Sequence, residues 1–331
     1  MTDALVHPLP SGDPTVAARG LVEGIERVVR GRLAVVELLV TAVLARGHVL
    51  IEDVPGTGKT TLATAFAASV GARCSRVQAT ADLLPADVTG AGVWDPATGG
   101  FRFVPGPVFA PVLLVDELNR TSPRTQSAFL EAMEERAVTV DGVRHRLPDP
   151  FVLIATQNSV EQHGTYPLPE GQLDRFAVRL VLGPVAEDVE RQVVREQLAG
   201  NRPEALSPVL DLAGLLDLQE ATAAVHVADA TLDLAVRLCR ATRTDPQVRS
   251  GAGTRAVLTL VRCAQGRAVL AGRDHVLPED VQALVVPVLA HRLVPGDAHS
   301  LLGEDGPAAR TVAQERLAAG LVPAVAVDLQ R

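Results

Sequence analysis

The sequence predicts an α/β fold: a parallel sheet with helices on both faces, followed by a smaller, all-α domain. Short apolar runs alternate with helix-like segments as far as residue 183, which is the pattern of strands joined by helical crossovers. Two of these runs, 111–115 and 151–155, are continuously apolar, as expected for strands buried on both faces. After Gly183 only helix-like segments follow, so we divide the chain into residues 1–183 and 184–331.

Composition limits the class of protein. A chain of 331 residues is long enough for two domains, and 47% apolar residues with only 3% aromatics predict a core of Val, Leu and Ala. The net charge of −8 argues against nucleic acid as the main partner, because neutralising phosphates requires a basic surface. The most apolar segment, 33–45, contains Glu37 and is too short to span a membrane, and residues 1–13 do not resemble a signal peptide. We therefore expect a soluble, cytoplasmic protein.

The first domain begins with two helices and continues as alternating strands and helices. We expect helices at 21–29, 33–45, 61–70 and 125–136, and strands at 48–51, 74–78, 111–115, 151–155 and 177–182. Two hairpins interrupt this alternation. The first, 91–104, has a Gly-containing turn, and the second, 138–146, turns at Asp141-Gly142, a favoured hairpin turn.

The second domain is predicted to be helical. The expected helices are 186–198, 210–224, 228–243, 252–270 and 278–291, with a loop at 199–208. Asp229 and Thr254 are expected N-cap residues, because their side chains can accept hydrogen bonds from free amides at a helix start. From 293 to 331 the chain is rich in Gly, Pro and Ala and carries only a weak helical signal.

A glycine-rich loop lies between the first strand and the next helix. Residues 51–61 read Ile-Glu-Asp-Val-Pro-Gly-Thr-Gly-Lys-Thr-Thr, which has the order of a phosphate-binding P-loop. Gly56 and Gly58 permit the backbone turns that point amide groups at a phosphate. Lys59 can reach the β- and γ-phosphates, and Thr60 can bind Mg²⁺. The strict pattern has Gly where this chain has Asp53.

Acidic and amide side chains follow two of the later strands. Asp116 and Glu117 end the run 111–115 as in a Walker B motif, where Asp116 would hold Mg²⁺ and Glu117 would activate the attacking water. Two acids at a strand end are also explained by contact with solvent. Asn158 ends the next buried strand, where an amide can hold water against the γ-phosphate; alone, it also suits a turn.

Two arginines are candidates for phosphate contacts, because a guanidinium keeps its charge and suits phosphate oxygens. Arg175 begins the last strand and could serve the nucleotide of a neighbouring subunit; the alternative is a surface ion pair with Asp174 or Glu170. Arg255 stands near a helix start in the second domain, and a helix start facing the cleft would bring it near the phosphates. The alternative for Arg255 is an ordinary exposed side chain.

Together these motifs resemble those of the MoxR family of AAA+ ATPases. The resemblance covers residues 21–293, and the segments that carry it are 52–60, 79–90, 116–120, 125–135, 155–158, 166–176 and 251–256. Asp53 in place of the first P-loop glycine is usual in this family. The resemblance implies a P-loop NTPase core of the AAA+ type and a helical lid domain. It also identifies 91–104 as an insert within helix 2 and 138–146 as the hairpin before sensor 1.

The resemblance implies ligands and a role for each candidate residue. ATP would be bound by the P-loop residues Asp53, Val54, Pro55, Gly56, Thr57, Gly58, Lys59, Thr60 and Thr61, and Mg²⁺ by Thr60 and Asp116. The catalytic set would be Glu117 as base, Asn158 as sensor 1, Arg175 as arginine finger and Arg255 as sensor 2.

The resemblance also implies partners. Such ATPases form rings, so we expect a homo-oligomer, a hexameric ring, whose hairpins face the centre and contact a client protein. Family members often act with partners that carry a von Willebrand factor A domain. Three features depart from the family pattern: Arg30-Gly31-Arg32 replaces Val-Gly-Gln near the adenine, Ser159 replaces a common Pro, and the tail after Leu293 matches poorly.

The expected function is ATP hydrolysis that drives chaperone-like remodelling or maturation of a partner protein, such as metal insertion. A metal-chelatase-type ATPase subunit would use the same residues, and no residue excludes it. An ATP-gated binding switch with little turnover is a non-enzymatic alternative, although such a switch does not need the full set of catalytic residues. A nucleic-acid motor is disfavoured by the net charge and by the lack of a basic run interleaved with aromatics.

Overall fold

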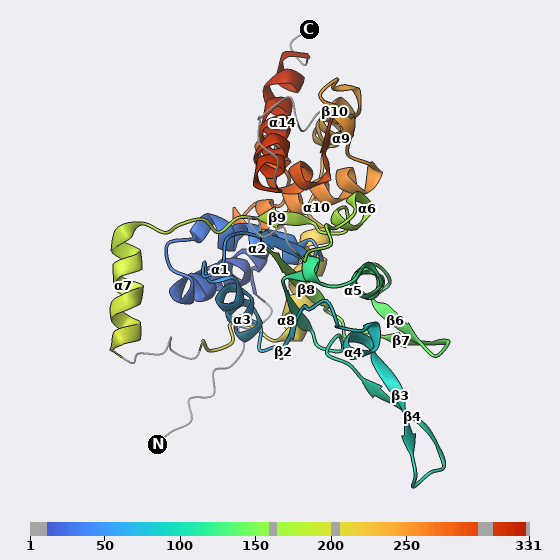
Figure 1. The fold of residues 1–331 in the computed structure, drawn as a ribbon. Coiled ribbons are helices and arrows are strands. Elements are labelled where there is room, and N and C mark those ends of the chain that lie inside the picture. The colour runs from blue at the N-terminus through green and yellow to red at the C-terminus, as the bar shows by residue number, and fades with distance from the viewer. Residues whose placement is uncertain (1–11, 159–163, 200–205, 297–306, 329–331) are drawn as a thin grey trace.

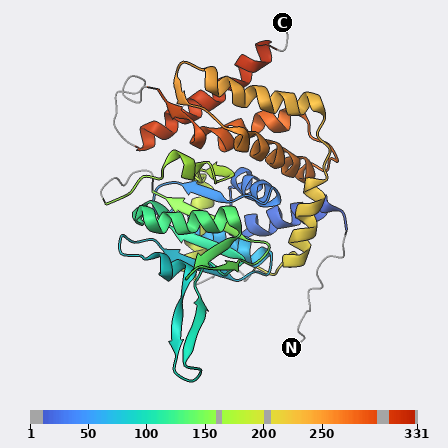
Figure 2. The same cartoon turned by 90° about the vertical axis from the view of Figure 1, so that its right-hand side faces the viewer.

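The computed structural model describes residues 12–158, 164–199, 206–296 and 307–328. Figure 1 shows an α/β part built on one parallel sheet, with a helical part stacked above it. Seen from the side, the helical part forms a layer across the top of the α/β part (Figure 2). This is the fold class that the sequence predicts. Ser159, most of the expected loop at 199–208 and the tail segment 297–306 lie outside the described residues.

The central sheet has five parallel strands in the order β2-β5-β8-β1-β9. Their bounds are β1 (Val49–Glu52), β2 (Cys74–Gln78), β5 (Val112–Asp116), β8 (Val152–Gln157) and β9 (Val178–Leu180). Because all five run in the same direction, their carboxyl ends meet at one edge, called here the carboxyl edge. Their amino ends meet at the opposite, amino edge.

In the three central strands, β5, β8 and β1, successive residues face opposite sides of the sheet and enter two separate hydrophobic clusters. In β5, Val112 and Leu114 join the first cluster, whereas Leu113 and Val115 join the second. The first cluster packs under α1 (Pro14–Val28), α2 (Leu33–Leu44) and α3 (Lys59–Ser69). The second packs under α4 (Pro85–Thr89) and α5 (Pro123–Glu135). Burial on both faces explains why β5 and β8 read as continuous apolar runs.

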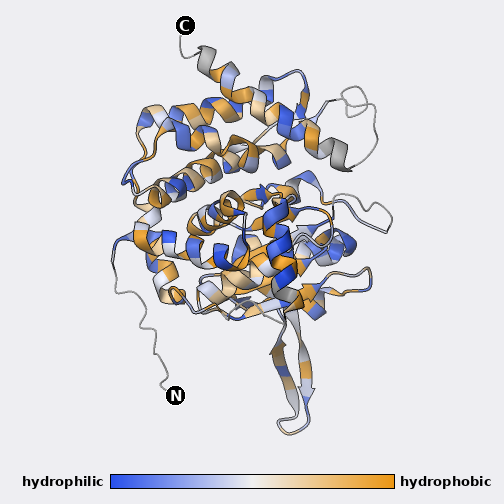
Figure 3. Ribbon diagram, turned by 90° about the vertical axis from the view of Figure 1, so that its left-hand side faces the viewer, coloured by the Kyte–Doolittle hydropathy of each residue, from blue (hydrophilic) through white to orange (hydrophobic). Residues whose placement is uncertain are grey.

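Two hairpins extend from the α5 side of the α/β part. They are formed by β3 (Gly90–Asp95) with β4 (Gly100–Pro105) and by β6 (Ala137–Val140) with β7 (Val143–Arg146). The first is a long arm that projects from the molecule and carries hydrophobic residues along its length (Figures 1 and 3). On this arm Trp94 and Phe101 face each other across the strands with ring centroids 5.4 Å apart, and Phe101 is 78% exposed.

The helical part contains most of the predicted helices. In chain order they are α7 (Glu187–Leu198), α8 (Leu212–Ala223), α9 (Asp229–Thr244), α10 (Thr254–Leu270), α11 (Pro278–Ala283), α12 (Val285–Leu289) and α14 (Pro307–Asp328). Of these, α7 and α8 lie beside the α/β part, and the others form the layer above it (Figures 1 and 2). Two short helical turns, η1 (Leu118–Arg120) and α6 (Glu170–Leu173), belong to the α/β part, and a third, η2 (Ala290–Arg292), belongs to the helical part. A small antiparallel ladder of β10 (Val248–Ser250) and β11 (Val294–Pro295) means that this part is not purely α-helical.

Local expectations fail at three places in the helical part. The expected helix 278–291 is broken into α11, α12 and η2, because Pro287 lacks an amide and its ring would clash with the carbonyl of the preceding turn. Asp229 and Thr254 are the first residues of α9 and α10 rather than their caps, which are Ala228 and Gly253. The tail, expected to be weakly helical, forms the 22-residue helix α14.

Helix α14 is stabilised by tertiary contacts rather than by its own sequence. Leu317, Ala318 and Leu321 are buried against the rest of the helical part. Gln314 donates a hydrogen bond to the carbonyl of Leu293 over 2.7 Å. The packing face of this helix therefore compensates for a weak helical signal in the sequence.

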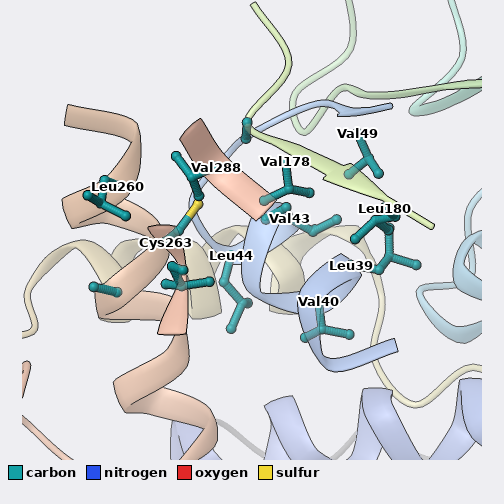
Figure 4. Close-up of a cluster of buried hydrophobic side chains, with 14 of the residues drawn as sticks. Leu39, Val40, Val43, Leu44, Val49, Val178, Leu180, Leu260, Cys263 and Val288 are labelled. Carbon is teal, nitrogen blue, oxygen red and sulfur yellow. The ribbon is translucent and has the colours of Figure 1, made fainter. Parts of the chain in front are cut away.

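One hydrophobic cluster connects the two parts of the molecule. Figure 4 shows Leu39 and Val43 of α2 and Val49 of β1 on one side, with Leu260 of α10 and Val288 of α12 on the other. The division at residue 183 therefore stays a prediction, because this core crosses it. No helix in the described ranges is both long and apolar enough to cross a membrane.

His48 ties the start of β1 to its neighbours. Its Nδ1 accepts a hydrogen bond from the amide of Leu153 over 3.0 Å, so its Nε2 carries the proton that is donated to the carbonyl of Met133 over 3.1 Å. Burial, helped by the charge of Arg136, lowers the pKa of His48 to about 3. The folded protein therefore keeps this ring neutral.

We expect His48 to make the protein less stable in acid. An unfolded histidine has a pKa of about 6.5, so below that pH the unfolded chain binds a proton that the folded chain excludes. Going from pH 7 to pH 5 should lower the free energy of unfolding by about 2 kcal/mol through His48 alone. Urea unfolding of the wild type and of His48→Gln at both pH values measures this, and the variant should lose less on acidification. Equal losses in the two proteins would contradict the prediction.

Candidate functional site

The glycine-rich loop, residues 53–58, connects the carboxyl end of β1 to α3. Gly56 and Gly58 have φ values of +83° and +91°, a region that favours glycine. Gly58 is the N-cap of α3 and provides no side-chain hydrogen bond, so side chains do not cap the first amides of the helix. Such amides, at the positive end of the helix dipole, form a binding site for a phosphate.

Asp53 joins the start of this loop to two other segments. Its Oδ1 accepts a hydrogen bond from the amide of Val54, and its Oδ2 accepts one from the amide of Gly183, each over 2.7 Å. Its own amide donates to the carbonyl of Gln157 over 3.2 Å. A glycine at position 53 would lose both side-chain bonds. The carboxylate therefore holds the loop against the segment that leads into the helical part.

Lys59 lies inside the loop and near the acids of the neighbouring strand. Its Nζ donates to the carbonyls of Asp53 over 2.7 Å and Val54 over 2.9 Å. Burial lowers the pKa of Lys59, while the negative charges of Asp53, Glu117 and Asp116 oppose that shift. The structure thus brings the ammonium group and the predicted Walker B acids into one electrostatic environment.

Asp116 ends β5 and is buried, with 6% of its surface exposed. One carboxylate oxygen accepts a hydrogen bond from Arg76 Nε of β2 over 2.6 Å. The other accepts one from Thr156 Oγ1 of β8 over 3.4 Å. A carboxylate of Asp116 and a hydroxyl of Thr60 are oxygen donors of the kind that Mg²⁺ binds, so these residues fit that ion. In the described part of the chain no cluster of three or more His, Cys, Asp or Glu residues offers a metal site.

Glu117 is held in an unusual backbone conformation by the next strand. Its φ of +58° is rare for a residue with a side chain. Its amide donates to Thr156 Oγ1 over 2.9 Å, and its carboxylate accepts a hydrogen bond from Gln78 Nε2 over 3.3 Å. The same carboxylate forms an ion pair with Arg120 Nε at 2.9 Å. The single hydroxyl of Thr156 therefore positions both acids.

Four of these supporting residues were missed by sequence reasoning: Arg76, Gln78, Arg120 and Thr156. Gln78 and Thr156 end or nearly end strands that flank β5, so the strand order would have indicated them. That order is decided by the tertiary structure. Asn158 follows β8 directly and is buried at the same carboxyl edge, between β5 and β1.

Arg175 and Arg255 lie at the amino edge, away from the loop of their own chain. Arg175 precedes β9, and Arg255 is the second residue of α10. Both donate hydrogen bonds to the carboxylate of Glu134, near the end of α5. They line a pocket of about 480 Å³ together with Gly47, which precedes β1. From Gly47 to Asp53 the chain is extended over about 20 Å at ~3.3 Å per residue.

The structure therefore separates two groups of candidate residues. Lys59, Thr60, Asp116, Glu117 and Asn158 gather at the carboxyl edge, and Arg175 and Arg255 gather at the opposite edge. Arg255 therefore does not lie beside the loop of its own chain, and its contact with phosphates stays a prediction. The alternative prediction for Arg175 is a surface ion pair with Asp174 or Glu170. Arg175 does form an ion pair, but its partner is Glu134.

The segment that carries Arg175 is held by the helical part. Arg292 of η2 is buried; its Nε donates to Asp174 Oδ1 over 2.9 Å, and its Nη2 donates to the carbonyl of Phe176 over 2.6 Å. His291 Nε2 lies 3.1 Å from the same carbonyl. These bonds hold Asp174 and Phe176, the residues on either side of Arg175.

The Arg-Gly-Arg segment before α2 lies beside the loop. Arg30 Nε donates to the carbonyl of Arg27 over 3.2 Å. The Nη1 of Arg32 is buried and has no hydrogen-bond partner within the described chain. Burial lowers the pKa of Arg32, and the charge of Asp53 opposes that shift. Arg32 thus lies in the electrostatic field of the loop, whereas Arg30 turns back onto α1.

Two family models match this chain. The first, the ATPase family associated with various cellular activities, matches residues 48–178 and so includes the loop, both acids and Arg175. The second, the AAA lid domain, matches residues 240–315. The lid match extends past Leu293, so the first part of the tail follows the family, contrary to the sequence-based expectation.

Several known proteins are similar over most of the chain. The uncharacterized protein YeaC of Bacillus subtilis is 43% identical over 302 residues, which cover 91% of this chain and 93% of that protein. Chaperone MoxR1 of Mycobacterium tuberculosis is 39% identical over 279 residues, 82% of this chain and 74% of that protein. Protein MoxR of Paracoccus denitrificans is 31% identical over 293 residues, 80% of this chain and 85% of that protein.

A solved structure agrees with these relatives. The crystal structure of a candidate ATPase from Cytophaga hutchinsonii superposes with a TM-score of 0.81 at 30% identity and covers 92% of this chain and 94% of that chain. The match extends through both the sheet and the helical part, in accordance with the two family models. The parallel sheet, the glycine-rich loop and the helical lid thus occur together in sequence relatives and in a structural neighbour, and the chain belongs to the MoxR family of AAA+ ATPases.

Proposed function

We propose that this protein hydrolyses ATP at a composite site, with the loop side supplied by one copy and the two arginines by a second. One observation carries this proposal: the nucleotide-binding residues and Arg175 with Arg255 lie at opposite edges of the same sheet. A sheet is too stiff to bring its two edges together within one chain. Two copies that pack head to tail would instead bring one copy's arginines to the other copy's loop.

Each residue has a distinct part in the proposed reaction. Lys59 and the first amides of α3 bind the phosphates of ATP. Glu117 accepts a proton from the attacking water, which Asn158 orients toward the γ-phosphate. Thr60 and Asp116 would hold Mg²⁺, which supplies positive charge to the phosphate oxygens when bound.

The second copy completes the site. Charge builds up on the transferred phosphoryl group and on the leaving oxygen during hydrolysis, and a guanidinium stabilises that charge. Arg175 and Arg255 of the second copy are the groups we assign to this role. Hydrolysis then depends on assembly, because an isolated copy lacks these contacts at its own loop.

A head-to-tail contact repeats from copy to copy and closes into a ring when the rotation allows. We propose a hexameric ring that remodels a partner protein, in keeping with the name of its relative Chaperone MoxR1. The projecting β3–β4 arm, with exposed Trp94 and Phe101, offers an apolar surface for such a client. A partner with a von Willebrand factor A domain and metal insertion into the client are specific forms of this proposal.

The Glu117→Gln variant should bind ATP and hydrolyse it at least 100-fold more slowly, because an amide cannot accept the proton. Retained radiolabelled ATP after gel filtration, together with phosphate release, measures both effects. Glu135→Gln, on α5 and facing the hairpin residue Arg144, is a matched control that should turn over normally. Rapid hydrolysis by Glu117→Gln would remove its role as base.

Arg175→Ala and Arg255→Ala should each bind ATP normally and hydrolyse it poorly. Mixing either variant with Lys59→Ala protein should restore part of the activity, because one protein then supplies an intact loop and the other intact arginines. An assay of phosphate release against mixing ratio measures this restoration. If Arg255→Ala is not restored while Arg175→Ala is, Arg255 does not act across the interface.

Thr156→Val should lower kcat roughly tenfold with little change in KM, because the hydroxyl that orients Glu117 is lost while the loop is intact. Steady-state kinetics measure the two constants. Thr222→Val removes another buried hydroxyl, in α8, where Oγ1 donates to the carbonyl of Leu218, and serves as control for stability. A parallel loss of kcat in both variants would indicate a general effect on folding.

A further inference from the structure

Arg175 and Arg255 come from different parts of the chain and meet at one carboxylate. Glu134 Oε2 accepts a hydrogen bond from Arg175 Nη1, and Glu134 Oε1 accepts one from Arg255 Nη2. Arg175 also donates to the carbonyl of Leu130, one turn earlier on α5, over 3.2 Å. The two guanidinium groups are therefore joined side by side by the two oxygens of a single side chain.

The shared carboxylate of Glu134 holds together two guanidinium groups that would otherwise move apart. Two positive charges repel each other, and an arginine side chain has many rotamers in solution, so two neighbouring arginines do not stay together unaided. A carboxylate between them cancels one charge and fixes both groups by charge-assisted hydrogen bonds. Arg262 also lines the pocket, and its positive charge adds to the repulsion.

No neighbouring acid takes the same place in the described part of the chain. Asp174 Oδ1 is already bound by the buried Arg292 at 2.9 Å, and Asp174 Oδ2 lies 3.9 Å from Arg255 Nε. Glu135, the next residue along α5, pairs instead with Arg144 of the β6–β7 hairpin at 2.9 Å. Glu134 is thus the one described carboxylate that contacts both arginines through hydrogen bonds.

We propose that Glu134 is a positioning residue that holds Arg175 and Arg255 as a paired unit for the terminal phosphate of ATP bound to a second copy. This inference rests on the proposed composite site and adds a residue to it. Glu134 does not itself touch the nucleotide. It acts through the arginines: two side chains that are already fixed in position lose less conformational entropy when they bind the phosphate.

Glu134→Gln tests this role with almost no change in size. Misplacing the pair should lower kcat roughly 10- to 100-fold while the KM for ATP stays within about twofold, since the loop that binds ATP is untouched. Glu135→Gln is the control on the same helix and should hydrolyse like the wild type. A thermal unfolding midpoint for each variant shows that both are folded.

Mixing experiments separate positioning from a structural role. Glu134→Gln protein has an intact loop, so Lys59→Ala protein, with intact arginines, should restore its activity. Arg175→Ala protein should not restore it, because then no copy offers a working arginine pair. The double variant Glu134→Gln/Arg175→Ala should be no slower than Arg175→Ala alone, because both changes act on the same group.

Each contrary outcome is distinct. Glu134→Gln activity equal to or above the wild type overturns the inference and would mean that the carboxylate only restrains the arginines. Multiplicative losses in the double variant, or no restoration by Lys59→Ala, also overturn it. If Lys59→Ala fails to restore even Arg175→Ala, the composite site itself is wrong, and the inference falls with it.

Discussion

The parallel direction of the five strands is the constraint on which the arrangement of this molecule depends. In such a sheet every residue that follows a strand lies at one edge, and every residue that precedes a strand lies at the other. Lys59 and Asn158 follow strands and Asp116 ends one, whereas Arg175 precedes a strand. The chain therefore cannot bring the arginines to its own P-loop without breaking the sheet. The parallel strand direction thus gathers the loop and the acids at one edge and keeps the two arginines of the same chain away from them.

Within each half, functional side chains are held by partners that do not take part in the chemistry themselves. Thr156 binds the Asp116 carboxylate and the Glu117 amide with one hydroxyl, and Glu134 binds two arginines with one carboxylate. In each case one side chain fixes two functional groups at once. Precise placement of this kind matters because charged groups stabilise a transition state only when they need not reorganise.

The helical lid touches both edges of the sheet. At the carboxyl end of β1, Glu52 accepts a hydrogen bond from Thr311 of α14 over 2.7 Å. Arg179 of β9 reaches Gln314 of the same helix over 2.8 Å, and near the amino end of β9, Arg292 holds Asp174. The Arg179–Gln314 contact is buried and the other two are partly buried, so these groups are costly to leave unpaired. The contacts therefore hold the lid firmly against the sheet.

The sequence by itself determined the α/β class, the P-loop at 51–61, the acids after the 111–115 run and the two hairpins. These features follow from local patterns: periodicity, glycine spacing and turn residues act within a few positions of the chain. Only the tertiary structure decided the order of the strands, the helix at 307–328 and the pairing of Arg175 with Arg255 through Glu134. Each of these depends on contacts between residues far apart in the chain. Arg255 shows the difference most clearly: its residue type indicated a phosphate contact, but the edge on which it lies was fixed by how α10 packs against the sheet.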